Sequence, residues 1–194
     1  MSKNKIVVCV DFSGSMGSRL KGAEPGIDNY CMLDLANLLL LSLVKGLPDG
    51  TSLSIIGFSS ALTRIIPPTV ITEDNRGTVF DHVKTAGLKP QGLTAMWEVL
   101  QKAVREFSSD PEGNNTILVL TDGNPTTTVP AGGLAHGLKD YIKTKMPPNL
   151  RLTIHSFGLG REVDSSMLDE LTNAFGGANI FVSDPGMAAA AFSA

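Results

Sequence analysis

The stretch IVVCVDFSGS, residues 6–15, decides the fold class. Its first five residues are apolar and mostly β-branched, which is typical of a strand buried on both faces. Such strands occur in parallel sheets, because helices cover both sides of those sheets. The strand is expected to end at Asp11, and a glycine-containing loop follows it.

The rest of the chain alternates short apolar runs with segments whose apolar residues recur at helical spacing. The expected strands cover residues 6–10, 53–58, 62–66, 116–121, 152–157 and 179–182. The expected helices cover residues 30–45, 74–86, 94–107, 134–145 and 165–174, and a last helix begins at residue 185. Connections of this length predict a doubly wound, three-layer α/β/α fold with a mostly parallel sheet.

Two local expectations refine this prediction. Residues 62–66 follow the second strand after a turn short enough for a hairpin, so the two should pair antiparallel, and Pro67-Pro68 should end the hairpin. The solvent side of the helix over residues 94–107 is expected to carry its charged residues, Glu98, Lys102, Arg105 and Glu106.

The chain is expected to form one domain over residues 1–194, because it has no internal repeat, low-complexity stretch or linker. Asp184-Pro185 combines a helix-capping side chain with a first-turn proline, which predicts the start of the last helix. The chain is expected to end inside that helix, as a domain excised from a longer protein would.

Composition indicates an ordinary globular domain. Of 194 residues, 42% are hydrophobic and 18% are charged, and the formal net charge is −3. No basic block is present, which argues against nucleic acid as a partner. The N-terminal residues lack the apolar segment of a signal peptide, and no apolar run approaches the ~20 residues of a membrane span. We therefore expect a cytoplasmic protein in which Cys9 and Cys31 are buried, reduced thiols.

Oxygen-bearing side chains gather where the expected strands end. Asp11 and Asp122 each follow a buried strand, and ligands of open α/β sheets bind outside the carboxyl ends of the strands. Ser13 and Ser15 follow Asp11, and Thr94 lies at the start of a helix. Hydroxyl and carboxylate oxygens are the ligands that a small, hard cation such as Mg²⁺ prefers.

The pattern Asp11-x-Ser13-x-Ser15, followed by Thr94 and Asp122, resembles the complete metal-ion-dependent adhesion site of the von Willebrand factor A (integrin I-like) family. The resemblance covers nearly the whole chain. It implies a Rossmann-like sheet of six strands in the order 3-2-1-4-5-6, with strand 3 antiparallel. It also implies that the two serines touch the ion, that the threonine and aspartates bind it directly or through water, and that an acidic side chain of a partner takes the sixth position.

The charge of these five side chains agrees with that use. Three are neutral hydroxyls and two are carboxylates, so a divalent ion held there stays electrophilic toward one more carboxylate. We therefore expect a protein-binding module that holds Mg²⁺, or else Mn²⁺ or Ca²⁺, and binds an Asp or Glu of a partner protein. The sequence leaves the oligomeric state open.

Other functions remain as alternatives. The strand-end aspartate of a haloacid dehalogenase-type phosphatase is a nucleophile, and Asp11 would take that role, but Ser13 stands where such enzymes have their general acid. The metal could instead be purely structural in a scaffold subunit. If Asp11 and the two serines formed only a helix-capping and turn cluster, Thr94 and Asp122 would be left unexplained. An EF-hand calcium loop would need a glycine at the position of Met16.

Overall fold

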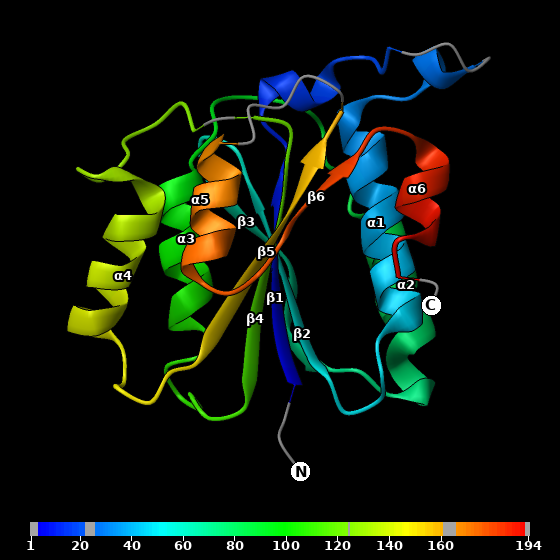
Figure 1. Cartoon of the computed structure of the whole chain (residues 1–194). Coiled ribbons are helices and arrows are strands. Elements are labelled where there is room, and N and C mark those ends of the chain that lie inside the picture. Colours follow the sequence, from blue (N-terminus) through cyan, green and yellow to red (C-terminus); the bar gives the residue numbers. More distant parts are fainter. Residues whose placement is uncertain (1–3, 22–25, 124, 161–165, 193–194) are drawn as a thin grey trace.

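A six-stranded sheet forms the centre of the computed structural model, which describes residues 4–21, 26–123, 125–160 and 166–192 (Figure 1). The strands are β1 (Asn4–Asp11), β2 (Ser52–Phe58), β3 (Leu62–Val70), β4 (Asn114–Thr121), β5 (Leu152–Leu159) and β6 (Asn179–Val182). Their order is β3-β2-β1-β4-β5-β6, with β3 antiparallel to β2 and the other described pairings parallel. The expected strand order and hairpin are confirmed.

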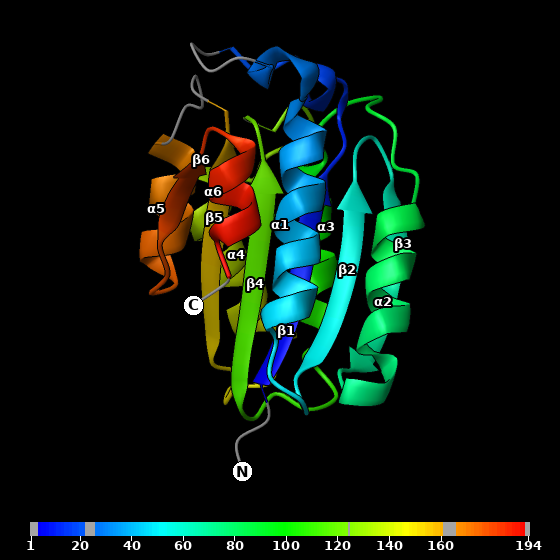
Figure 2. The ribbon, with the colours of Figure 1, turned by 90° about the vertical axis from the view of Figure 1, so that its right-hand side faces the viewer.

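Helices cover both faces of this sheet (Figures 1 and 2). One face carries α1 (Met32–Gly46), α2 (Glu73–Thr85) and α6 (Pro185–Ala190), and the other carries α3 (Met96–Arg105), α4 (Gly133–Lys145) and α5 (Ser166–Ala174). Because successive side chains of a strand point to opposite faces, Val8 and Val10 of β1 join the core under α1, while Val7 and Cys9 join the core under α3. This confirms that β1 is buried on both sides.

The prediction that Pro67-Pro68 ends β3 is wrong. β3 continues to Val70 and pairs again with β2 beyond the prolines, where Thr69 lies opposite Leu53. A proline lacks the N–H that a central strand needs, but β3 is an edge strand with a neighbour on one side only. A register shift after Leu53 accommodates the interruption.

Two expectations about α3 also need correction. The helix begins at Met96 rather than at residue 94, so Thr94 lies in the preceding loop. The Glu106 side chain does not face solvent: it is 8% exposed and forms an ion pair with Arg64 of β3. Helical periodicity placed Glu106 on the outer face, but the edge strand covers that position.

The last helix starts as expected and ends early. The side chain of Asp184 accepts a hydrogen bond from the main-chain N–H of Met187 (2.9 Å), which caps α6. The helix ends at Ala190, so the expectation that the chain ends inside it is wrong. The predicted start of α5 at residue 165 lies outside the described residues. Among the described helices, none has both the length and the apolar composition needed to cross a bilayer.

The two cysteines should differ in reactivity. Both are free thiols, and Cys9 is fully buried whereas Cys31 is partly exposed. Burial raises the pKa of each thiol, and the charge of Glu106 raises that of Cys9 further. We expect a thiol reagent such as DTNB to modify Cys31 slowly in the native protein and Cys9 only after unfolding. Equal rates for both thiols in the native protein would contradict this prediction.

Candidate metal site

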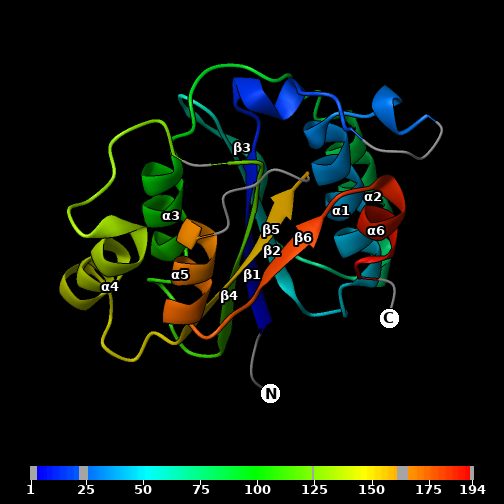
Figure 3. The same ribbon diagram turned by 45° about the horizontal axis from the view of Figure 1, so that its top comes forward.

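The two aspartates belong to neighbouring strand ends at the carboxyl end of the sheet, where the strand order reverses. The two strands, β1 and β4, lie next to each other in the middle of the sheet (Figure 3). Asp11 is the last residue of β1, and Asp122 directly follows β4, which is the parallel neighbour of β1. Chain connections leave this point in opposite directions, toward β2 on one side and β5 on the other. That arrangement creates a crevice outside the strand ends in open α/β sheets.

Asp11 is fully buried, and both of its carboxylate oxygens are engaged. Oδ1 accepts the main-chain N–H of Ser13 (2.7 Å), and Oδ2 accepts the hydroxyl of Thr121 (2.6 Å). Burial raises the pKa of Asp11 to about 6, although the hydrogen bonds from Thr121 and Ser13 act in the opposite direction and Asp122 adds to the rise. The Asp11 carboxylate is therefore held in one orientation beneath the serine loop, and its negative charge is energetically unfavourable there.

Ser13, Ser15 and Asp122 form a continuous chain of oxygens above Asp11. The hydroxyls of Ser13 and Ser15 are 3.2 Å apart, and the Ser15 hydroxyl donates to Oδ1 of Asp122 over 3.0 Å. The short 3₁₀ turn η1 (Gly14–Gly17) curls the loop, and the two hydroxyls lie within hydrogen-bonding distance of each other. Burial raises the pKa of Asp122, while its hydrogen bond from Ser15 lowers it.

These spacings suit an octahedral cation. Ligands at the 2.0–2.1 Å distance of Mg²⁺ place neighbouring oxygens about 2.9 Å apart. The two oxygen–oxygen separations in the structure, 3.2 and 3.0 Å, are close to that edge length. Within the described part of the chain, no group of three or more His, Cys, Asp or Glu side chains could hold a metal, so hydroxyls would have to supply part of the coordination.

Thr94 lies on a loop that is hydrogen-bonded to the serine loop through main-chain atoms. The carbonyl of Gly92 accepts the N–H of Gly14 (3.1 Å), which ties this loop to the serine loop. The N–H of Thr94 donates to the Thr126 hydroxyl (2.8 Å), and its carbonyl accepts the N–H of Thr126 (3.2 Å). The loops that carry the five predicted residues are thus hydrogen-bonded to one another. Side chains make two of these links, from Asp11 to Thr121 and from Ser15 to Asp122, whereas the Thr94 loop is joined through Gly92 and through main-chain atoms of Thr94.

Sequence reasoning missed the residues that brace the site. Thr121 orients Asp11, Thr126 holds Thr94, and the Ser60 hydroxyl accepts the N–H of Leu93 (2.8 Å). The position of Thr121, directly before Asp122 at the end of a strand beside β1, was the one available indication. Ser60 and Thr126 lie more than thirty residues from the main chain that they hold, so no local pattern marks them.

A substitution at Gly92 should disturb the site without touching a predicted ligand. Gly92 has a φ of +72°, and a Cβ there would lie 2.5 Å from the Ser60 hydroxyl oxygen. We expect Gly92→Ala to displace the Thr94 loop and weaken Mg²⁺ binding on the order of tenfold, as measured by calorimetric titration. Gly87→Ala is the matched control, because Gly87 has a similar φ of +64° but its Cβ would meet only the Thr85 carbonyl at 3.7 Å. Equal affinities in both variants would contradict this account.

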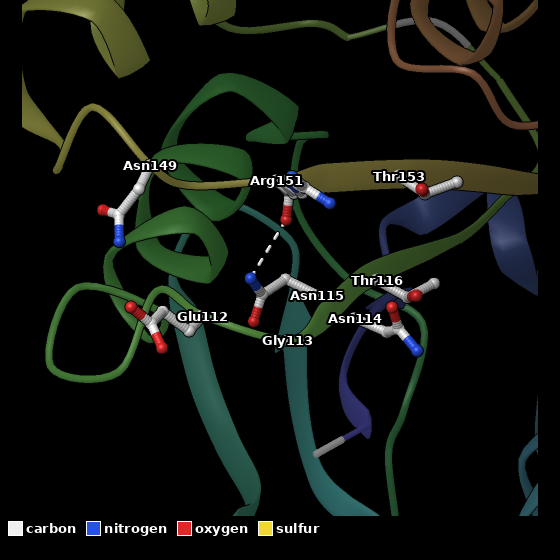
Figure 4. Close-up of a pocket in the computed structure, with 8 residues that line it drawn as sticks. All are labelled: Glu112, Gly113, Asn114, Asn115, Thr116, Asn149, Arg151 and Thr153. Atoms are coloured by element: carbon white, nitrogen blue, oxygen red, sulfur yellow. Dashed lines mark hydrogen bonds between the residues drawn. The ribbon is translucent and has the colours of Figure 1, made fainter. Parts of the chain in front are cut away.

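A polar hollow of about 590 Å³ lies at the opposite end of the sheet (Figure 4). At its floor, Asn115 is 2% exposed, and its amide nitrogen donates to the carbonyls of Pro111 (2.7 Å) and Arg151 (3.0 Å). The Asn115 side chain therefore joins the loop before β4 to the loop before β5. This hollow is far from the aspartates at the strand ends, and we assign it a structural role.

A sequence model of the von Willebrand factor type A domain matches residues 4–181. The chain belongs to this family. Von Willebrand factor A domain-containing protein 5A from Mus musculus is 24% identical over 179 residues, which are 92% of this chain and 21% of the mouse protein. The rat protein of the same name gives 24% identity and 20% of its length, so the chain spans a small part of these relatives.

Solved structures share the fold of this von Willebrand factor type A domain. A von Willebrand factor type A protein from Catenulispora acidiphila superposes with a TM-score of 0.77 at 23% identity, covering 98% of this chain and 41% of that one. Proximal thread matrix protein 1 from the mussel byssus, in a structure whose metal-ion-dependent adhesion site is occupied by zinc, superposes with a TM-score of 0.70 at 16% identity. That comparison covers 99% of this chain and 46% of the mussel protein.

Proposed function

We propose that this domain is a divalent-cation-dependent protein-binding module. Asp11, Ser13, Ser15, Thr94 and Asp122 would hold Mg²⁺, and the ion would bind a carboxylate from an Asp or Glu of a partner protein. The family commonly uses this fold for metal-dependent protein interaction. The observation that carries the proposal is the run of Ser13, Ser15 and Asp122 oxygens at separations of 3.2 and 3.0 Å.

The choice of ion follows from the donor atoms. All five side chains offer oxygen, and neither nitrogen nor sulfur is among the proposed ligands, which favours a hard cation over a soft one. Mg²⁺ matches the oxygen spacing, and Mn²⁺ or Ca²⁺ could use the same ligands. The zinc-occupied site of the mussel protein supports the idea that this fold can hold a cation at this rim.

The local charge explains why a cation, and then a carboxylate, would bind. Asp11 is buried and Asp122 is partly buried, and the raised pKa of each carboxyl reflects the cost of keeping it charged away from water. A divalent ion would offset that cost. The two carboxylates would balance the formal charge of the ion, but the other three ligands are neutral hydroxyls. The ion would therefore retain affinity for a further anionic oxygen from a partner.

Metal binding is the first part of the proposal to test. We expect saturating Mg²⁺ to stabilise the chelator-treated protein by about 2–3 kcal/mol, which raises the thermal midpoint by roughly 5–10 °C. Asp122→Asn and Ser15→Ala should remove most of this shift. Asp28→Asn is the matched control, because Asp28 is an exposed aspartate of the neighbouring turn η2 (Ile27–Asn29) and should leave the shift intact.

Partner binding is the second part. Proteins captured from a lysate in Mg²⁺ should elute with EDTA, and the double variant Asp11→Ala, Asp122→Ala should capture none of them. Capture that survives both chelation and the double substitution would refute the proposal. A large Mg²⁺-dependent stabilisation without any metal-dependent partner would favour the structural-metal alternative.

The phosphatase alternative predicts turnover of p-nitrophenyl phosphate in Mg²⁺. We expect none, because Ser13 stands where such an enzyme has its general acid and a serine hydroxyl cannot take that role. In the structure the Ser13 hydroxyl lies 3.2 Å from that of Ser15. A cytoplasmic location and a single domain over residues 1–194 stay predictions from the sequence.

A further inference from the structure

The dipeptide Asp122-Gly123 directly follows β4 and contains one of the predicted metal ligands. In an Asp-Gly pair the main-chain nitrogen of the glycine can attack the carboxyl carbon of the aspartate side chain, because glycine has no Cβ to hinder the approach. The product is a cyclic imide, and its hydrolysis leaves either aspartate or isoaspartate. The chain contains a second Asp-Gly pair, Asp49-Gly50, in a different environment.

Asp49-Gly50 is held at every group that takes part in this reaction. The N–H of Gly50 donates to the carbonyl of Ile71 (2.8 Å). One carboxylate oxygen of Asp49 is paired with Arg76, and the other accepts the N–H of Glu73 (3.0 Å). Ring closure at this pair would have to break all three interactions, so the folded structure protects it.

Asp122-Gly123 is held more loosely, because it lies beyond Thr121, the last residue of β4. The N–H of Gly123 donates to the Thr121 hydroxyl over 3.3 Å, which is longer than an ordinary N–H···O hydrogen bond. A Cβ at Gly123 would meet nothing within 4 Å, so the main chain has room to turn. The nitrogen that must attack is therefore less restrained here than in Asp49-Gly50.

We propose that Asp122 isomerises spontaneously through a cyclic imide with Gly123, and that a cation bound to Asp122 suppresses this reaction. The bond between the Gly123 nitrogen and the Asp122 Cγ forms as the nitrogen loses its proton. One carboxylate oxygen leaves as water with that proton and one proton from solvent. Water then adds to one of the two imide carbonyls, and addition at the main-chain carbonyl gives isoaspartate. No oxidant or further reactant is needed, because aspartate and isoaspartate have the same composition.

The suppression by a cation rests on the proposed function of the site. A cation would occupy the carboxylate oxygen that has to take up protons before it leaves as water. Isoaspartate adds a methylene group to the main chain and shortens the side chain, so the carboxylate would move away from the Ser15 hydroxyl that now donates to it (3.0 Å). The metal-free domain would therefore lose a predicted ligand with time, whereas the metal-loaded domain would keep it.

Peptide mapping by mass spectrometry tests the isomerisation, because trypsin places the two pairs in separate peptides, residues 46–64 and 106–139. Electron-transfer fragmentation distinguishes isoaspartate from aspartate. Asp110 does not interfere, since the nitrogen of the following Pro111 carries no proton. In native protein with EDTA at neutral pH, Asp122 should isomerise roughly tenfold faster than Asp49, which corresponds to one or two fewer hydrogen bonds to break. In urea the two pairs should react at equal rates.

Gly123→Ala is the matched variant for the attacking residue. The added Cβ has room in the fold and hinders the nitrogen, so Asp122 should isomerise several-fold more slowly while the protein stays folded. A native protein in which Asp122 reacts no faster than Asp49, or in which Gly123→Ala reacts as fast as the wild type, would overturn the proposal.

Mg²⁺ tests the protective role of a cation. At a saturating concentration it should slow the reaction of Asp122 by roughly tenfold or more, because only the metal-free fraction reacts, and leave Asp49 unchanged. If calorimetry shows bound Mg²⁺ and the rate at Asp122 does not fall, the protective role is wrong. If calorimetry shows no binding, the proposed function and the protective role fail together, whereas the isomerisation measured in EDTA stands.

Discussion

Gly177→Ala should destabilise the domain by roughly 3 kcal/mol or more. Gly177 lies between α5 and β6, and its N–H donates to the carbonyl of Thr172 (2.9 Å), which closes the end of α5. A Cβ at this position would lie 1.7 Å from the carbonyl oxygen of Ile154 and 2.5 Å from its carbon. These atoms belong to the backbone of β5, which is held between β4 and β6 and cannot move aside cheaply.

Urea unfolding measures this effect, and Gly77→Ala is the control. Gly77 lies in α2, and a Cβ there would meet nothing within 4 Å. Alanine loses less conformational entropy than glycine in a helix, so this variant should be more stable than the wild type by about 0.5–1 kcal/mol. A Gly177→Ala protein that unfolds within about 1 kcal/mol of the wild type would show that β5 and α5 separate more easily than the contact indicates.

Arg64→Met should lower the free energy of unfolding by about 3 kcal/mol, because it leaves the Glu106 carboxylate inside the protein without its charged partner. The Glu106 side chain is 8% exposed, and apart from its ion pair with Arg64 neither of its oxygens has a hydrogen-bond partner among the described residues. Arg64 also donates to the Ser54 hydroxyl (2.7 Å), which fixes the guanidinium on the surface of the sheet. An unpaired charge with so little solvent contact strongly destabilises the folded state.

The double variant Arg64→Met, Glu106→Leu separates the ion pair from packing. Removing both charges should recover most of the stability lost in Arg64→Met, since well-packed apolar residues often replace a buried ion pair without net cost. The exposed pair His136–Asp140 is the comparison, and Asp140→Asn should change the unfolding free energy little. If the double variant is as unstable as Arg64→Met, then the arginine contributes mainly through its apolar stem and its bond to Ser54.

The architecture of this protein could be predicted from its sequence because the relevant information is local. The apolar run before Asp11 identifies a doubly buried strand, and helical spacing of apolar residues identifies the covering helices. The same local reading found the Asp11 to Ser15 loop and the strand-end position of Asp122, and the resemblance to a family combined these residues with Thr94 into one site. The structure places these residues on loops that are hydrogen-bonded to one another.

Only the tertiary structure decided which neighbours surround each residue. Pro67 and Pro68 remain inside a strand because β3 has an open edge, and Glu106 is buried because that edge strand covers it. Thr121 and Thr126 fix the site through hydrogen bonds to residues 110 and 32 positions away. Periodicity along the chain reports which face of an element is apolar, but it carries no information about which distant segment will pack there, and that choice determines burial, ion pairing and the shape of the rim.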